Sequence, residues 1–82
     1  MSVPISFAQF LVSLGSSAMV HLGETPDPAT GARTANAPMA RHTLDVLTLL
    51  KTKTAGNLDN DEQRLIDALI EEISTKLDAL KA

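Results

Sequence analysis

Apolar positions recur at helical spacing in three segments of this 82-residue chain. Spacings of three and four residues keep side chains on one side of an α-helix. In the first segment these positions are Phe7, Phe10, Leu11, Leu14, Ala18 and Leu22. Ser6 with Gln9 three residues later fits a capping box, and Gly23 suits the left-handed position that ends a helix. We therefore predict a first helix over residues 6–22.

The middle of this first helix is small, at Gly15, Ser16, Ser17 and Ala18. A glycine inside a helix costs about 1 kcal/mol relative to alanine. We expect the close approach of another helix to compensate for that cost.

The second segment, residues 37–55, is apolar over more than half of its circumference. Asn36 suits the N-cap, and Pro38 is tolerated in the first turn. At about 100° per residue, an unbroken arc of roughly 160° holds Met39, Ala40, Leu44, Val46, Leu47 and Leu50. Leu49 widens this arc to roughly 220°. A helix this apolar must be covered on more than one side, so we predict self-association or a partner protein.

The third segment, residues 60–81, carries one apolar stripe about 140° wide. Its members are Leu65, Ile66, Leu69, Ile70, Ile73, Leu77 and Leu80. Glu72 and Lys76 are placed for an ion pair one turn apart on this helix. The sequence therefore predicts an all-α fold, with three helices in a small bundle that forms a single domain over residues 1–82.

Two connections join the predicted helices. Residues 23–38 form a Pro- and Gly-rich loop, and a loop this long in so small a domain is often functional or partly disordered. After the second helix, Gly56 suits a positive φ, and Leu58 can fold back onto the core. Asp59 with Glu62 then fits a capping box for the third helix.

Composition narrows the class of protein. The chain has no cysteine, which excludes disulfides, thiol nucleophiles and thiolate metal ligands. The N-terminus lacks the basic segment of a secretory signal, and no apolar run approaches the roughly 18 residues of a membrane span. We expect a cytoplasmic protein without membrane contact.

The net charge of −3 is unevenly distributed. Residues 31–57 carry four basic residues against Asp45 alone, whereas residues 58–82 carry seven acidic residues against three basic ones. The basic segment contains no aromatic side chain that could stack on a base, so we expect no nucleic-acid partner. We expect the two segments to complement each other within the fold or across a dimer.

Candidate chemical motifs fail on spacing. A calcium loop starting at Asn57 would need glycine at its sixth position, where Glu62 stands. His21 and His42 lack the HExxH spacing, and the string LGSSA is not a nucleophile elbow. We therefore predict no enzyme, no catalytic residue, no metal and no cofactor. The alternative is a small metal- or ligand-binding protein that uses the 57–62 loop and the histidines.

Two strings, LVSLGSSAMVHLGE and ARHTLDVLTLLKTKTAGNLDNDEQRLI, carry a family resemblance. Residues 6–77 resemble a family of small bacterial cytosolic proteins known as a domain of unknown function. Its pattern is an apolar helix ending in Leu-Gly, a Pro-containing loop, and a helix ending in Lys-Thr-x-Gly-Asn-Leu. The matching residues are Leu22, Gly23, Pro28, Asp45, Leu50, Lys53, Thr54, Gly56, Asn57, Leu58 and Glu62. Asp59 departs from the Thr or Ser that is usual there.

The resemblance implies a regulatory module without catalytic residues. One polarity regulator in the family acts with a response regulator to promote nucleotide exchange on a Ras-like small GTPase. The implied partners are thus an MglA-like GTPase and a RomR-like response regulator, in bacterial cell polarity and motility. From charge and expected exposure, we predict that the partner-binding residues are Arg33, Arg41, Leu49, Lys51 and Lys53. We also predict a homo-oligomer.

Overall fold

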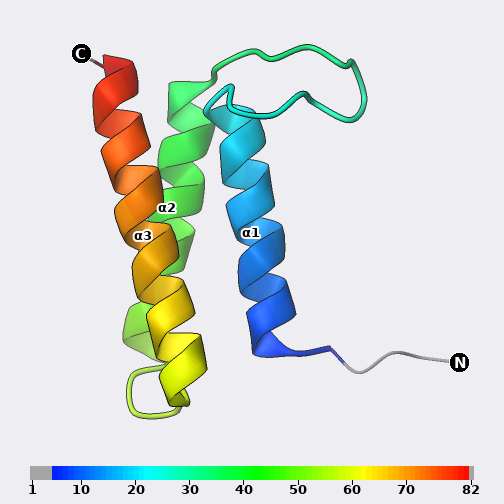
Figure 1. Cartoon of the computed structure of the whole chain (residues 1–82). Coiled ribbons are helices and arrows are strands. Elements are labelled where there is room, and N and C mark those ends of the chain that lie inside the picture. The colour runs from blue at the N-terminus through cyan, green and yellow to red at the C-terminus, as the bar shows by residue number, and fades with distance from the viewer. Residues whose placement is uncertain (1–4, 82) are drawn as a thin grey trace, which may run out of the picture.

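The computed structural model describes residues 5–81, which form three α-helices and no strand. Helix α1 spans Phe7–His21, α2 spans Ala37–Lys53 and α3 spans Asn60–Lys81. Helices consecutive in the sequence run antiparallel, so α1 and α3 run in the same direction, and α2 lies behind them in the view of Figure 1. The predicted all-α fold is therefore confirmed. Residues 1–4 and 82 of the predicted domain lie outside the described residues.

Local hydrogen bonds set the start of each helix. The Ser6 hydroxyl accepts the N–H of Gln9 at 3.1 Å, and the Asn36 side chain accepts that of Met39 at 3.2 Å. At α3 the capping box is complete. The N–H of Asp59 donates to the Glu62 carboxylate at 2.9 Å, and that of Glu62 donates to the Asp59 carboxylate at 2.8 Å. These bonds confirm the N-caps predicted from sequence.

The helix ends differ slightly from prediction. Helix α1 ends at His21, with Leu22 as its C-cap and Gly23 at a φ of 78°. Helix α2 ends at Lys53, two residues before the predicted end, because Thr54 already has a φ of −102° and a ψ of 6°. The Thr54 hydroxyl donates to the Leu50 carbonyl at 2.7 Å, which satisfies a carbonyl at the end of the helix.

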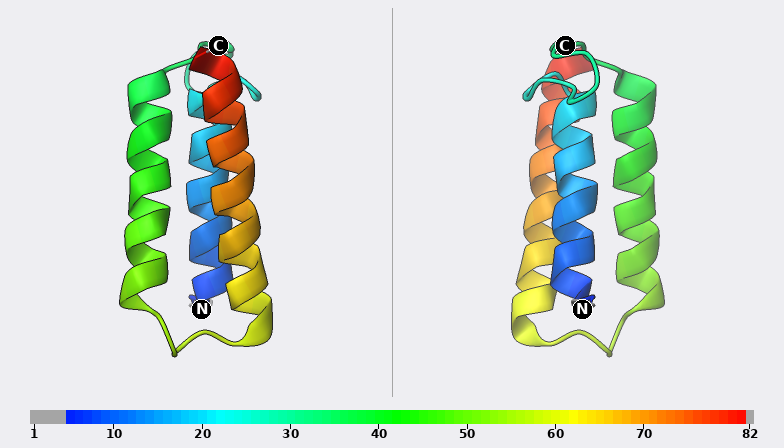
Figure 2. Two further views of the ribbon diagram at one scale, coloured as in Figure 1. Left: turned by 90° about the vertical axis from the view of Figure 1, so that its left-hand side faces the viewer. Right: turned by 90° about the vertical axis from the view of Figure 1, so that its right-hand side faces the viewer.

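The core lies between the three helices, each of which packs against both of the others (Figure 2). Nine apolar residues form it: Leu11, Ala18, Leu22, Ala40, Leu44, Leu47, Ile66, Ile73 and Leu77. Leu58 packs against this cluster, as predicted. Phe10 and Leu80, which the periodicity assigned to the apolar stripes, are exposed.

Helices α1 and α3 approach closely at Gly15, which is buried. A Cβ atom at this position would lie 2.8 Å from Cδ2 of Leu69, closer than side chains normally approach. The glycine therefore makes room for the Leu69 side chain, which confirms the close approach expected from the small residues of α1.

The connection between α1 and α2 is folded onto the end of the bundle. The N–H of Asn36 donates to the His21 carbonyl at 2.6 Å, and that of Asp27 donates to the Ala32 carbonyl at 2.9 Å. Glu24 forms an ion pair with Lys76 of α3 at 3.2 Å. The predicted Glu72–Lys76 pair is therefore wrong, because Lys76 reaches across to this connection instead.

None of the helices in residues 5–81 combines the length and apolar character needed to cross a membrane.

Candidate interaction surface

The four basic residues proposed for partner contact lie at two places along α2. Arg33 precedes the helix and Arg41 lies in its second turn, whereas Lys51 and Lys53 lie in its last turn. At 1.5 Å per residue, Arg41 and Lys53 are about 18 Å apart along the axis. The structure therefore separates these residues into two groups rather than one patch.

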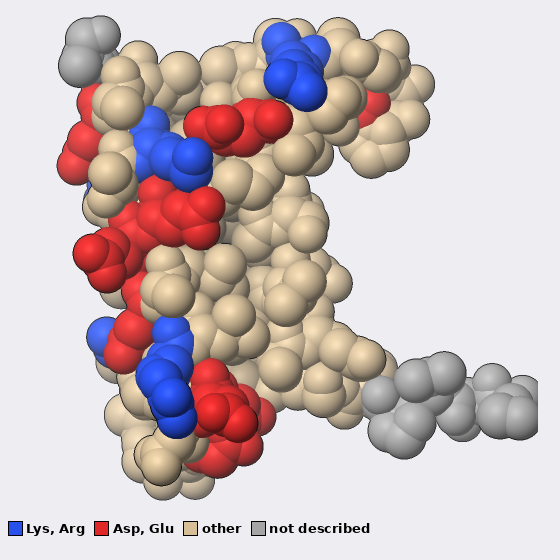
Figure 3. All heavy atoms as spheres, viewed as in Figure 1, with Lys and Arg blue, Asp and Glu red and all other residues tan. Residues whose placement is uncertain are grey.

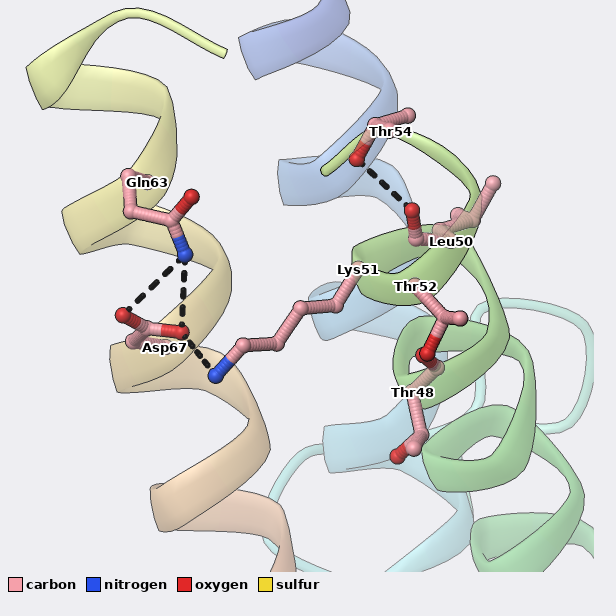
Figure 4. A network of polar contacts seen from close by, with 7 residues as sticks. All are labelled: Thr48, Leu50, Lys51, Thr52, Thr54, Gln63 and Asp67. Carbon is pink, nitrogen blue, oxygen red and sulfur yellow. Dashed lines mark hydrogen bonds and ion pairs between the residues drawn. The ribbon is translucent and has the colours of Figure 1, made fainter. Parts of the chain in front are cut away.

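Lys51 is engaged within the fold. Its Nζ lies 2.7 Å from Oδ1 of Asp67 on α3, and both side chains are about half-exposed. The Gln63 amide, one turn before Asp67, donates to both carboxylate oxygens at 3.2 and 3.3 Å (Figure 4). This pair joins the basic helix α2 to the acidic helix α3, as the charge distribution predicted.

The same contacts change the acidity of Asp67. The hydrogen bond from Lys51 lowers the pKa of this carboxyl below its usual value of 3.8, and the hydrogen bond from Gln63 lowers it further. Partial desolvation opposes this shift, and the charge of Lys51 supports it. Folding thus favours the ionised carboxylate, which stabilises the α2–α3 contact above the ordinary pKa.

A pH-dependent stability difference should follow from this shift. We expect Asp67→Asn to have a lower melting temperature than the parent chain at neutral pH. The difference should shrink as the pH falls below 3.8 through the lowered pKa of Asp67, because the parent then loses its charge as well. Thermal melts from pH 7 to pH 2 would measure it. A difference that persisted at the acid end, or that was unchanged in a Lys51→Gln background, would contradict this assignment.

Leu49 and Lys53 lie one turn apart on the outside of α2. The Leu49 side chain is 57% exposed, and Lys53 is exposed without an ion pair among the described residues. They continue a line along the helix at alternating spacings of three and four residues: Met39, His42, Val46, Leu49 and Lys53. We call this line the α2 seam. This spacing keeps the five side chains on one side of the helix, and the apolar members Met39 and Leu49 are exposed there.

The sequence predicts only part of the α2 seam. The width of the apolar arc indicates that Leu49 lies outside the core, and the apolar residues Met39 and Val46 lie on the same side of the helix as Leu49. Arg41 lies outside the seam and pairs with Asp45 at 3.1 Å, with both side chains more than half exposed. Such surface pairs contribute little, so the Arg41 guanidinium stays accessible to a partner.

Residues 57–62 span the start of α3, where the Asp59 and Glu62 side chains cap this helix. Within residues 5–81, no group of three or more His, Cys, Asp or Glu side chains is arranged to hold a metal ion. A hollow of about 330 Å³ lies between the end of α1 and the following loop. His21 and Asp27 line it, but the Asp27 carboxylate already accepts the N–H of Ala29 at 2.8 Å.

Comparison with known proteins identifies a family and no closer relative. No curated protein and no solved structure matches the chain. The model of a domain of unknown function, DUF1844, matches residues 4–77, which include all of α1 and α2 and most of α3. The chain therefore belongs to the DUF1844 family of domains of unknown function.

Proposed function

We propose that this chain is a non-enzymatic interaction module that binds a partner protein through the α2 seam. The proposal rests on one observation. Leu49 and Lys53 are both exposed and lie one turn apart on the outside of α2. The three-helix core covers the opposite side of this helix, at Leu44 and Leu47. An apolar contact beside an accessible cation is typical of a binding surface, where the apolar group gives affinity and the charge guides association.

The proposed partner is a Ras-like small GTPase of the MglA type. This step rests on the resemblance to RomX, a member of the family that promotes nucleotide exchange together with the response regulator RomR. An exchange factor needs no chemistry of its own, because it acts by binding the nucleotide-free GTPase more tightly than the loaded one. A helical surface that bound the two states with different affinities would meet that requirement. The chain would then act in bacterial cell polarity and motility.

Release of a fluorescent GDP analogue tests the proposal directly. The chain should bind the Ras-like GTPase of its own organism and accelerate release, alone or with the response regulator present. Affinity should depend on the nucleotide state, because equal affinity for all states would shift no equilibrium. Unchanged release and no complex, with and without the response regulator, would refute this function. Micromolar binding of calcium, zinc or magnesium in a calorimetric titration would favour the metal-binding alternative instead.

Two variants locate the surface. Leu49→Ala should weaken binding about tenfold, or about 1.4 kcal/mol, by removing the apolar contact. Lys53→Glu should slow association most at low salt. Arg64→Glu is the control, because it reverses the charge of an exposed cation on α3, away from the seam. It also places a carboxylate near Asp61, but that side chain is almost fully exposed, so the effect on the fold should be small. Lys51→Glu is a poorer probe, since it would also place two carboxylates together at Asp67. Equal losses for Lys53→Glu and Arg64→Glu would show that the partner contacts another surface.

A further inference from the structure

The outward face of α1 carries no charge. No Asp, Glu, Lys or Arg occurs in Phe7–His21, whereas the exposed sides of α2 and α3 carry both signs. In Figure 3 the surface over α1 shows neither colour of charge, and the charged side chains gather over α3 and the two ends of the bundle. The exposed or half-exposed residues on this face are Gln9, Phe10, Val12, Ser13, Ser16, Ser17 and Val20, with Ser13 near its middle. We call it the uncharged face.

The uncharged face has projections at one end and a hollow at the other. Phe10 is 43% exposed and Val12 is 53% exposed, both in the first half of α1. A largely apolar hollow of about 250 Å³ lies at the second half. Its lining is Ser16, Ser17, Val20, His21 and Pro28.

The projections of one copy can fit the hollow of a second copy whose α1 helix runs in the opposite direction. Phe10 and Ser17 are seven residues apart, which is nearly two full turns, so they lie on one edge of the face about 10 Å apart. Val12 and Ser16 share the other edge. A two-fold axis beside Ser13, midway between these positions, brings each projection of one copy to the small residues of the other. Small side chains also allow two helices to approach closely.

Charge favours a second copy over a different partner. In a two-fold interface the side chains at the axis meet their own copies, so a charge at that position would face the same charge. The uncharged face places Ser13 at the axis and has no Asp, Glu, Lys or Arg around it, so it avoids this repulsion. We propose that two copies of this chain associate through their uncharged faces, with the α1 helices antiparallel. This surface is separate from the α2 seam, so the proposal stands apart from the proposed function.

The expected dimer is reversible. A helix of 15 residues is about 22 Å long, so the contact lies at the small end of protein interfaces. Light scattering or sedimentation should show the mass rising from 8.7 kDa toward twice that value as the concentration increases through the micromolar range. A mass that stayed at 8.7 kDa into the millimolar range would overturn the proposal.

Substitutions at Ser13 test the location of the contact. Ser13→Glu should weaken the dimer at least about tenfold, because two like charges would meet at the axis. Mixing the Ser13→Glu and Ser13→Lys chains should restore association. Thr52→Glu is the matched control, since Thr52 on α2 is also exposed and its hydroxyl, like that of Ser13, donates to the carbonyl four residues before it. A dimer that survived Ser13→Glu but not Thr52→Glu would place the interface elsewhere.

The absence of cysteine allows a geometric test that does not rely on charge. Under mild oxidation, Ser13→Cys should form a disulfide-linked dimer, and Thr52→Cys should stay largely monomeric. Equal yields from the two variants would overturn the two-fold arrangement. Neither test involves the GTPase, so failure here and failure of the exchange assay are distinguishable.

Discussion

Leu47→Ala is expected to lower the free energy of unfolding by about 2–5 kcal/mol. Leu47 is completely buried within the central cluster. Truncation removes buried methyl groups and leaves a cavity that the helices can only partly close. An 82-residue domain at about 0.05–0.15 kcal/mol per residue has roughly 4–12 kcal/mol of stability in total. This one change should therefore remove a large fraction of it.

Leu49→Ala provides the matched control, because it is the same chemical change two residues later on the same helix. Leu49 is 57% exposed, so its truncation should change the free energy of unfolding by about 0.5 kcal/mol or less. Urea denaturation of both variants, fitted for midpoint and slope, would measure the difference. Equal destabilisation would mean that the outside of α2 is as buried as its inside, contrary to this structure.

The local features of the fold were predictable because their causes are local. Each N-cap is a hydrogen bond between residues three apart, as at Ser6 and Gln9, so the string of residue types determines it. The same holds for Gly23 and Gly56, where a positive φ is inexpensive only for glycine. The predicted end of α2 is two residues too late, because the chain already leaves helical geometry at Thr54, which has a φ of −102° and a ψ of 6°, before it reaches Gly56.

The partners of the charged side chains were less predictable, since they depend on how the helices pack. The net charges of the two segments implied an attraction between α2 and α3, and Lys51 with Asp67 provides it. The charges did not reveal that Lys76 bonds to Glu24, which is 52 positions away, rather than to Glu72 one turn before it. The candidate surface shows the same limit. The sequence proposed Leu49 and Lys53 as contacts, and their four-residue spacing places them one turn apart on a helix. Only the packing shows that both are exposed while Lys51 points toward α3.

Gly56→Val is expected to destabilise the chain by more than about 1 kcal/mol. Gly56 has a φ of 85°, in the region that a β-branched side chain adopts only under strain. No atom lies within 4 Å of the position that its Cβ would occupy, so the effect should come from the backbone and not from a collision. In a domain of this size the melting temperature should fall by about 4 °C or more.

The neighbouring Ala55 supplies the control for Gly56→Val. Ala55 is also exposed between α2 and α3, and no residue other than glycine has a positive φ in the described chain. Ala55→Val introduces the same side chain without the left-handed conformation, so its melting temperature should stay close to that of the parent. Gly56→Asn should fall between the two valine variants, because asparagine tolerates a positive φ better than valine does. An unchanged melting temperature for Gly56→Val would mean that the chain does not turn at this residue, and that α2 and α3 are connected differently in solution.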